Sequence, residues 1–339
     1  MDTRDSPEQA ELRRSARQLA SALGPGTVAG LDDDARRDRL ADAVRDAGWL
    51  ELRDDAGDGA PVAGGAEAAI VAEALGAAVA DVAFTGPVLA RDLLRRAGLA
   101  RADVAVAYAP ALEGVATVEG TKTAEPVHAI EVAPGDDHAI LLTPAGALGQ
   151  VPVAGAACGT DLTRPVATVA PGAAVEAFAG DVTADDLASW TALGLALTSA
   201  DLVGVMRGVL DITVAYAVER KQYGVPVGSF QAVQHLLAEA RCLLEGSASA
   251  ALYAAWAVDN LPPADAVSAG RVAKAYCARA ARNVCETAVQ VHGGIGNTWE
   301  CVVHVYLRRA LLSAQWFGDD AVQLGTLRAD RLGVPVGLP

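Results

Sequence analysis

The feature that most constrains the fold is a run of long helical patterns between Thr183 and about Leu332. Leu193, Leu195 and Val205 show that apolar side chains occur on several faces of the first of these helices, which must therefore be packed on more than one side. The pattern predicts a four-helix bundle with a further face for subunit association. The segments with apolar residues at helical spacing are 185–220, 229–260, 264–292 and 300–315.

The rest of the chain divides into a helical part and a strand-rich part. Residues 7–99 show helical spacing, broken by a Gly/Asp/Pro-rich stretch at 54–65. Short apolar runs separated by glycine, proline and aspartate follow up to about residue 179, and they indicate strands in a segment too short for a closed barrel. The expected fold class is mainly α with a small, reduced β domain, and the expected domains are 1–101, 102–182 and 183–339.

Composition and charge exclude several classes of protein. The chain has 339 residues, a formal net charge of −15 and a pI near 4.7, so a broad surface for nucleic acid or anionic membranes is not expected. No apolar run reaches the roughly 20 residues that span a bilayer, and the sequence does not begin with a signal-like segment. The five cysteines form no C-x-x-C pair, and the five histidines show no metal-ligand spacing. We expect a cytoplasmic protein without a metal site.

The first motif runs from Glu219 to His235 and reads ERKQYGVPVGSFQAVQH. It combines a helix end, a Gly/Pro turn and a new helix start. Taken alone, it fits a helix hairpin in which Arg220 and Lys221 lie favourably near the C-terminal end of a helix dipole.

The second motif runs from Ala288 to Glu300 and reads AVQVHGGIGNTWE. Its glycines could cap a helix, and they would also let backbone N–H groups approach a phosphate closely. His292 is expected to support the glycine turn. This motif alone does not distinguish a helix cap from a phosphate-binding turn.

The two motifs, in this order and about 70 residues apart, resemble those of the acyl-CoA dehydrogenase family. The resemblance is strong from about Leu202 to Ala310, and it implies the acyl-CoA dehydrogenase fold, with an N-terminal helical domain, a β domain and a C-terminal bundle. It also implies FAD as cofactor, an acyl-CoA thioester as substrate and an electron-transfer flavoprotein as acceptor. The residues that the resemblance assigns to FAD, mostly across a subunit interface, are Arg220, Gln222, Tyr223, Gln290, Gly293 and Gly294.

The sequence departs from the family where catalysis occurs. Family members remove the substrate α-proton with a glutamate, and the two usual positions of this base correspond here to Phe317 and Gly194. The β-domain loop that flanks the flavin ring is replaced by the sequence AYAPALEGV at 107–115. Asp201, two helical turns from Gly194, is a weak candidate for a substitute base, and Asp319 a weaker one.

Three hypotheses follow from what is kept and what is lost. The first is a companion subunit that completes the FAD site of a catalytic partner, as in the heteromeric (α2β2) dehydrogenases of actinobacterial steroid side-chain degradation. The second is a stand-alone homo-oligomeric dehydrogenase with an unusual base such as Asp201. The third is a flavin-free scaffold subunit that keeps the fold for assembly alone.

Overall fold

The computed structural model describes residues 3–99, 104–118, 120–133, 135–143 and 147–333. The N-terminal part is helical, as its apolar spacing predicts, and Ser6 and Gln9 form a capping box at its first helix. The third helix, α3, packs along the long bundle helix α5 and so connects this part to the bundle. The elements are α1 (Pro7–Leu23), η1 (Ala29–Asp32), α2 (Asp34–Asp46), η2 (Trp49–Glu51), α3 (Gly65–Ala77) and α4 (Thr85–Arg96).

The middle part is a seven-stranded open sheet in the order β5-β6-β2-β1-β3-β4-β7, within the described residues. Neighbouring strands are antiparallel except for β1 and β3, which are parallel. Alanines such as Ala107, Ala129 and Ala139 are fully buried in its core, which is consequently thin. The strands are β1 (Ala105–Tyr108), β2 (Val127–Ile130), β3 (His138–Leu142), β4 (Ala147–Pro152), β5 (Ala157–Cys158), β6 (Pro165–Val169) and β7 (Glu176–Asp181).

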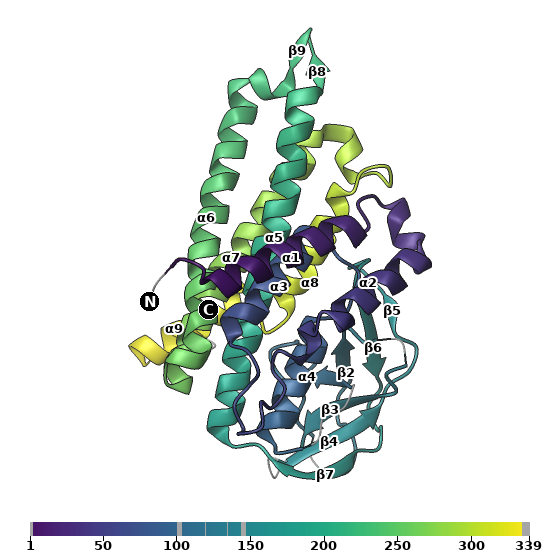
Figure 1. Cartoon of the computed structure of the whole chain (residues 1–339), viewed down its shortest axis with the longest axis vertical. Helices are drawn as coiled ribbons and strands as arrows, with labels where there is room; N and C mark the ends of the chain where they lie inside the picture. The colour runs from purple at the N-terminus through teal and green to yellow at the C-terminus, as the bar shows by residue number, and fades with distance from the viewer. Residues whose placement is uncertain (1–2, 100–103, 119, 134, 144–146, 334–339) are drawn as a thin grey trace.

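The C-terminal part is the predicted bundle. Figure 1 shows two of its long helices, α5 and α6, rising side by side away from the sheet, with a small hairpin at their tip. Thr183 and Asp186 form a capping box that begins α5, and Gly293 ends α7 with a positive φ of 66°. The elements are α5 (Ala184–Glu219), β8 (Lys221–Gln222), β9 (Val225–Pro226), η3 (Val227–Ser229), α6 (Gln231–Asn260), α7 (Pro263–His292), η4 (Gly293–Asn297), α8 (Val303–Gln315) and α9 (Asp320–Leu332).

Helix α5 is long and apolar enough to cross a membrane, yet 89% of its most apolar window is buried inside the protein. It packs against α3, α6, α7 and α8. Burial on every side is typical of a core helix and explains why apolar residues occur on several of its faces.

The proposed domain limits fall near changes of secondary structure. Strand β7 ends at Asp181 and α5 begins at Ala184, next to the predicted limit at 182/183. The other limit, 101/102, lies outside the described residues. The division into three domains stays a prediction.

Candidate functional site

The two usual positions of the catalytic base lie in direct contact. Gly194 is in the first third of α5, and Phe317 follows α8 with a positive φ of 67°. A Cβ atom placed on Gly194 would overlap the ring of Phe317. Because both residues are buried, neither a carboxylate nor a substrate has room between them.

Phe317 belongs to a cluster of four buried aromatic residues, which we call the aromatic plug: Tyr108, Trp190, Trp316 and Phe317. The ring centroid of Phe317 lies 5.2 Å from that of Trp190 and 5.8 Å from that of Tyr108. Tyr108 is the last residue of β1 and lies within 107–115, the segment that the resemblance aligns with the family's flavin-flanking loop. The plug thus fills the space between the sheet and α5, and burial raises the pKa of the Tyr108 phenol.

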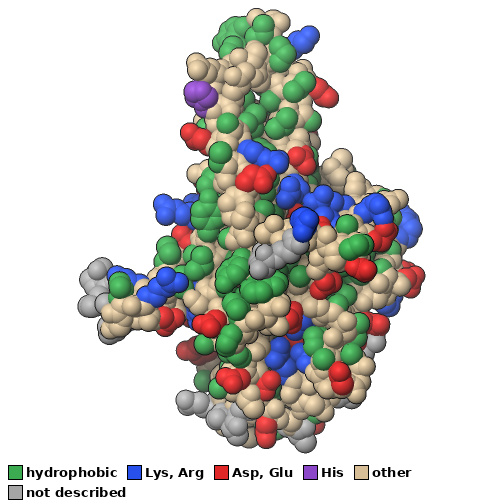
Figure 2. Space-filling view, turned by 60° about the vertical axis from the view of Figure 1, so that its left-hand side comes forward, with side chains coloured by type: hydrophobic (Ala, Val, Ile, Leu, Met, Phe, Trp, Pro, Cys, Tyr) green, Lys and Arg blue, Asp and Glu red, His purple; other side chains and the backbone are tan. Residues whose placement is uncertain are grey.

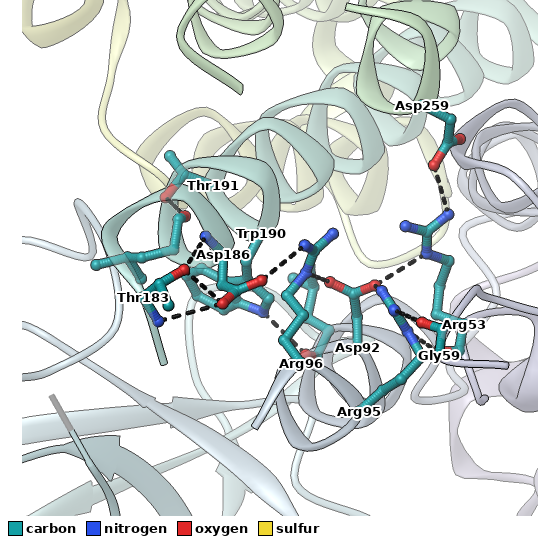
Figure 3. Close-up of polar contacts among 12 residues, drawn as sticks. Arg53, Gly59, Asp92, Arg95, Arg96, Thr183, Asp186, Trp190, Thr191 and Asp259 are labelled. Atoms are coloured by element: carbon teal, nitrogen blue, oxygen red, sulfur yellow. Dashed lines mark hydrogen bonds and ion pairs between the residues drawn. The ribbon is translucent and has the colours of Figure 1, made fainter. Parts of the chain in front are cut away.

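The plug contacts helix α4, which also carries a buried ionic network. The indole N–H of Trp190 donates to the carbonyl of Leu89 in α4, at 2.9 Å. Figure 3 shows Asp92, on the same helix, among guanidinium groups, and Arg96 continues from it to Asp186 at the start of α5. Burial would raise the pKa of Asp92, but the surrounding arginines outweigh it and hold that pKa below its usual value. The arginines that contact Asp92 are Arg53 (3.1 Å), Arg95 (2.8 Å) and Arg96 (2.7 Å).

The structure does not support Asp201 as a base. Its carboxylate is buried and accepts hydrogen bonds from Arg309 at 2.7 Å and from the Ser313 hydroxyl at 2.7 Å, and Arg164 lies at 2.9 Å. Burial would raise the pKa of Asp201, but Arg164 and Arg309 hold it far below the usual range. A carboxylate so strongly held in its ionised form is a poor proton acceptor. Asp201 is a structural ion-pair centre.

Asp319, the weaker candidate, has a local role. It is the N-cap of α9, and its carboxylate accepts the backbone N–H of Val322 at 2.9 Å. Asp319 follows Phe317 by two residues, and its carboxylate is used to cap a helix.

The three candidate FAD residues of the first motif lie at the tip of the bundle. Arg220 ends α5, Gln222 is in the hairpin strand β8, and Tyr223 follows it. All three are exposed, Tyr223 by 94%, and Tyr223 packs edge-on against Phe230 with a centroid distance of 6.4 Å. Figure 2 shows apolar and basic side chains together at this end of the molecule. The tip presents polar donors and apolar surface to the outside.

The candidate residues of the second motif lie at the end of α7. Gln290 is exposed in its last turn, and Gly293 and Gly294 begin η4 with open space where a Cβ would point. Gly293 needs its positive φ, which glycine adopts at little cost. A hydrogen bond from Tyr216 in α5 to the carbonyl of His292 brings this motif to the same end of the bundle as the first.

Sequence reasoning did not find the plug as a unit. Phe317 was singled out, but Tyr108 and Trp190 come from distant segments and no motif connects them to it. The sequence offers one indirect indication, because large aromatic residues are rare in this chain. It has only five tryptophans and four phenylalanines, and two of these tryptophans and one of these phenylalanines belong to the plug. Among the described residues, no group of three His, Cys, Asp or Glu could hold a metal ion.

Part of the chain is similar to a family of known proteins. Residues 192–332 match the family model described as "Acyl-CoA dehydrogenase, C-terminal domain". The C-terminal part of the chain is therefore similar to the C-terminal domain of acyl-CoA dehydrogenases.

Individual proteins refine the comparison. The chain is 37% identical over 172 residues to the acyl-CoA dehydrogenase IpdE2 of Mycolicibacterium smegmatis, and the match covers 50% of each. Among solved structures, it is similar to a chain of the ChsE4-ChsE5 complex from Mycobacterium tuberculosis, with a TM-score of 0.79, 26% identity and coverage of 99% and 100% of the two chains. It shares its fold with a chain of the Tcur3481-Tcur3483 steroid acyl-CoA dehydrogenase variant, with a TM-score of 0.77, 22% identity and coverage of 96% and 99%. The match to IpdE2 spans about half of that relative's length.

Proposed function

We propose that this chain is a subunit of a flavin-dependent acyl-CoA dehydrogenase and that it completes the FAD site of a catalytic partner chain. The partner would hold the flavin ring, the acyl-CoA thioester and the base. In such enzymes FAD accepts hydride from the substrate β-carbon while a carboxylate removes the α-proton. This chain's contribution would be binding and orientation, not proton transfer.

The observation that carries the proposal is the contact between Phe317 and Gly194. One aromatic ring occupies both usual positions of the base, inside a plug that leaves no room for a flavin ring or thioester. A chain closed in this way is a poor candidate for catalysis on its own.

The tip of the bundle carries groups suited to the adenosine diphosphate part of an FAD whose ring is held by the partner chain. The guanidinium of Arg220 is exposed and can donate two parallel hydrogen bonds to a diphosphate, and the amides of Gln222 and Gln290 are exposed as well. The open space at Gly293 and Gly294 would let a phosphate approach the backbone. The residues present therefore fit the adenosine diphosphate part of FAD and not its ring.

The relatives support a two-chain assembly. One similar structure is a complex of two differently named proteins, and another is called a steroid acyl-CoA dehydrogenase. We propose an α2β2 arrangement acting in steroid or related lipid breakdown in the cytoplasm, with an electron-transfer flavoprotein as acceptor. The polyanionic partners excluded by charge, nucleic acid and anionic membrane, have no place in it.

Two other hypotheses are less well supported. A stand-alone dehydrogenase needs a base near the substrate, and Asp201 is buried among Arg164, Arg309 and Ser313 instead. A flavin-free scaffold has no use for the exposed Arg220 and the open glycine turn, and it predicts that Arg220→Ala leaves the flavin content of the assembly unchanged.

The test is to purify this chain alone and again after co-expression with a dehydrogenase-like partner, and to record the visible flavin spectrum and native mass. We expect flavin only in the mixed assembly, with one FAD for every two chains. Stoichiometric FAD on the lone chain would contradict the companion proposal.

A further inference from the structure

Two aromatic side chains join the flavin-contact motifs. Tyr216, in the last turn of α5, and His292, the last residue of α7, stack with ring centroids 4.2 Å apart and an interplanar angle of 22°. The Tyr216 hydroxyl also donates to the backbone carbonyl of His292 at 3.3 Å, across 76 residues of sequence. The pair lies within one helical turn of both motifs.

On the α5 side, Tyr216 also fixes the position of the Arg220 backbone. The backbone N–H of Arg220 donates to the carbonyl of Tyr216 at 2.8 Å, which is the last bond of the helix. A shift of Tyr216 would therefore be transmitted directly to the backbone of Arg220 and to the hairpin behind it.

On the α7 side, the ring of His292 is held in place by a hydrogen bond to its own helix. Its Nδ1 lies 2.9 Å from the carbonyl of Ala288, and since a carbonyl only accepts, Nδ1 carries the proton. The ring is buried, and burial lowers the pKa of His292, so the neutral form is favoured at pH 7. Gly293 follows immediately, and the positions of its N–H and of the next glycine depend on where His292 sits.

The pair is the main polar connection at this end of the bundle. Among the described residues, no other hydrogen bond or ion pair connects residues 214–230 with residues 286–300. The candidate ligand-contact groups on both sides are exposed and have few contacts of their own. Their relative placement consequently depends on the two helix ends that Tyr216 and His292 hold together.

We propose that Tyr216 and His292 are positioning residues that hold Arg220 and the Gly293-Gly294 turn at the separation required by one dinucleotide diphosphate. This inference rests on the proposed function, because it assumes that both motifs face the same flavin. Donors that are fixed in advance lose less conformational entropy when a ligand binds, so loosening them weakens binding without removing any contact group.

The experiment uses the mixed assembly of this chain with its catalytic partner. FAD is titrated into the deflavinated assembly carrying Tyr216→Leu or Tyr216→Phe, and the visible circular dichroism of the bound flavin and the melting temperature are recorded. Tyr216→Leu removes both the stack and the hydrogen bond, and Tyr216→Phe keeps the stack. Tyr253→Leu is the control, since Tyr253 also stacks on an aromatic ring, that of Trp256 in α6, with a centroid distance of 5.9 Å, although Tyr253 is exposed and Tyr216 half-buried.

We expect Tyr216→Leu to weaken FAD binding about tenfold, the factor that corresponds to one aromatic pair. We also expect it to change the flavin circular dichroism, with Tyr216→Phe restoring most of the affinity and Tyr253→Leu having no effect. Unchanged affinity and dichroism in Tyr216→Leu would overturn the inference.

Arg220→Ala separates failure of this inference from failure of the proposed function. If Arg220→Ala weakens FAD binding and Tyr216→Leu does not, only the positioning role is wrong. If Arg220→Ala also leaves FAD binding unchanged, the tip does not contact flavin and both proposals fall.

Discussion

The aromatic plug and the bundle tip are the two regions to which the family resemblance assigns proton removal and FAD contact, and they differ sharply in this chain. At the plug, Gly194 and Phe317 have closed the space that a base and substrate would need. At the tip, Arg220 and Gln290 remain exposed beside a glycine turn with nothing above it. The interior has become hydrophobic core, and the exterior has kept groups suited to a diphosphate.

This difference shows that the plug contributes to the stability of the fold, whereas the tip is available for binding. Buried aromatic residues contribute to the free energy of folding through burial and close packing. Exposed polar groups contribute little to folding and are available for binding. Substitutions in the plug should therefore change stability, and substitutions at the tip should change flavin affinity in the mixed assembly.

The largest expected effect comes from breaking the plug. Phe317→Ala should lower the free energy of unfolding by about 3–5 kcal/mol, because it leaves a cavity beside Gly194. Denaturant unfolding of the chain measures this. In the same background Gly194→Ala should cost less than it does alone, since the ring it would overlap is gone. Gly204→Ala, which meets backbone of α3 instead, is the control whose cost should not change.

Removing the ion-pair centre should have the next largest effect. Asp201→Asn should cost about 3 kcal/mol because Arg164 and Arg309 lose their buried counter-charge. The folded-state pKa of Asp201 is lowered, so its contribution is present above the usual carboxyl pKa and is lost as pH falls through the folded value. Acid unfolding followed by circular dichroism should be less steep in Asp201→Asn, while Asp211→Asn, exposed on the same helix, should match the wild type.

At the tip, the effect should appear in binding alone. Arg220→Ala should weaken FAD affinity of the mixed assembly by about tenfold to a hundredfold, the usual loss for a charge-assisted hydrogen bond, without a change in melting temperature. Lys221→Ala, the adjacent exposed cation, tests whether charge alone is enough. Equal losses in both variants would mean that the tip attracts the diphosphate without specific contact.

The smallest expected effect is a change in pH dependence inside the bundle. Burial lowers the pKa of Lys274 to about 7, and its ammonium donates to the carbonyl of Ser313. Between pH 7 and the ordinary pKa of a lysine, Lys274 binds fewer protons in the folded chain than in the unfolded chain. This group therefore makes the stability of the folded chain rise with pH. Lys274→Met should flatten that rise and should be more stable than the wild type by about 1 kcal/mol near pH 6.

A pH series of denaturant unfolding measures this effect. Lys221→Met removes an exposed lysine and should leave the profile unchanged. Identical slopes in wild type and Lys274→Met would show that Lys274 stays charged when folded.

Local patterns predicted the bundle well because helix periodicity and end signals are local properties. Helices α5, α6 and α7 begin and end within two residues of the expected limits, where Thr183, Gly293 and the Gly/Pro turn mark them. The start of α8 was placed at residue 300 and lies at Val303, because residues 298–302 form a turn first.

The site was predicted only where it is continuous in sequence. Phe317 and Gly194 were identified by counting along motifs, but their contact depends on a backbone turn at Phe317 that no local pattern indicates. The surroundings of Asp201, the weak candidate base, could not be predicted from sequence for a similar reason. Its partners Arg164 and Arg309 lie far away in the chain, and a carboxylate in a helix looks the same before they are known.

Through Arg164, the sheet has a structural role that does not depend on any ligand. From the segment between β5 and β6 it reaches Glu131 at 2.8 Å and Asp201 at 2.9 Å, while Glu131 in turn accepts the backbone N–H groups of Phe84 and Gly86 at the start of α4. One guanidinium thus connects sheet, bundle and N-terminal helices. A shortened chain without the sheet would leave Asp201 and Arg309 with an incomplete set of buried charges, so the bundle needs the β part for its own stability.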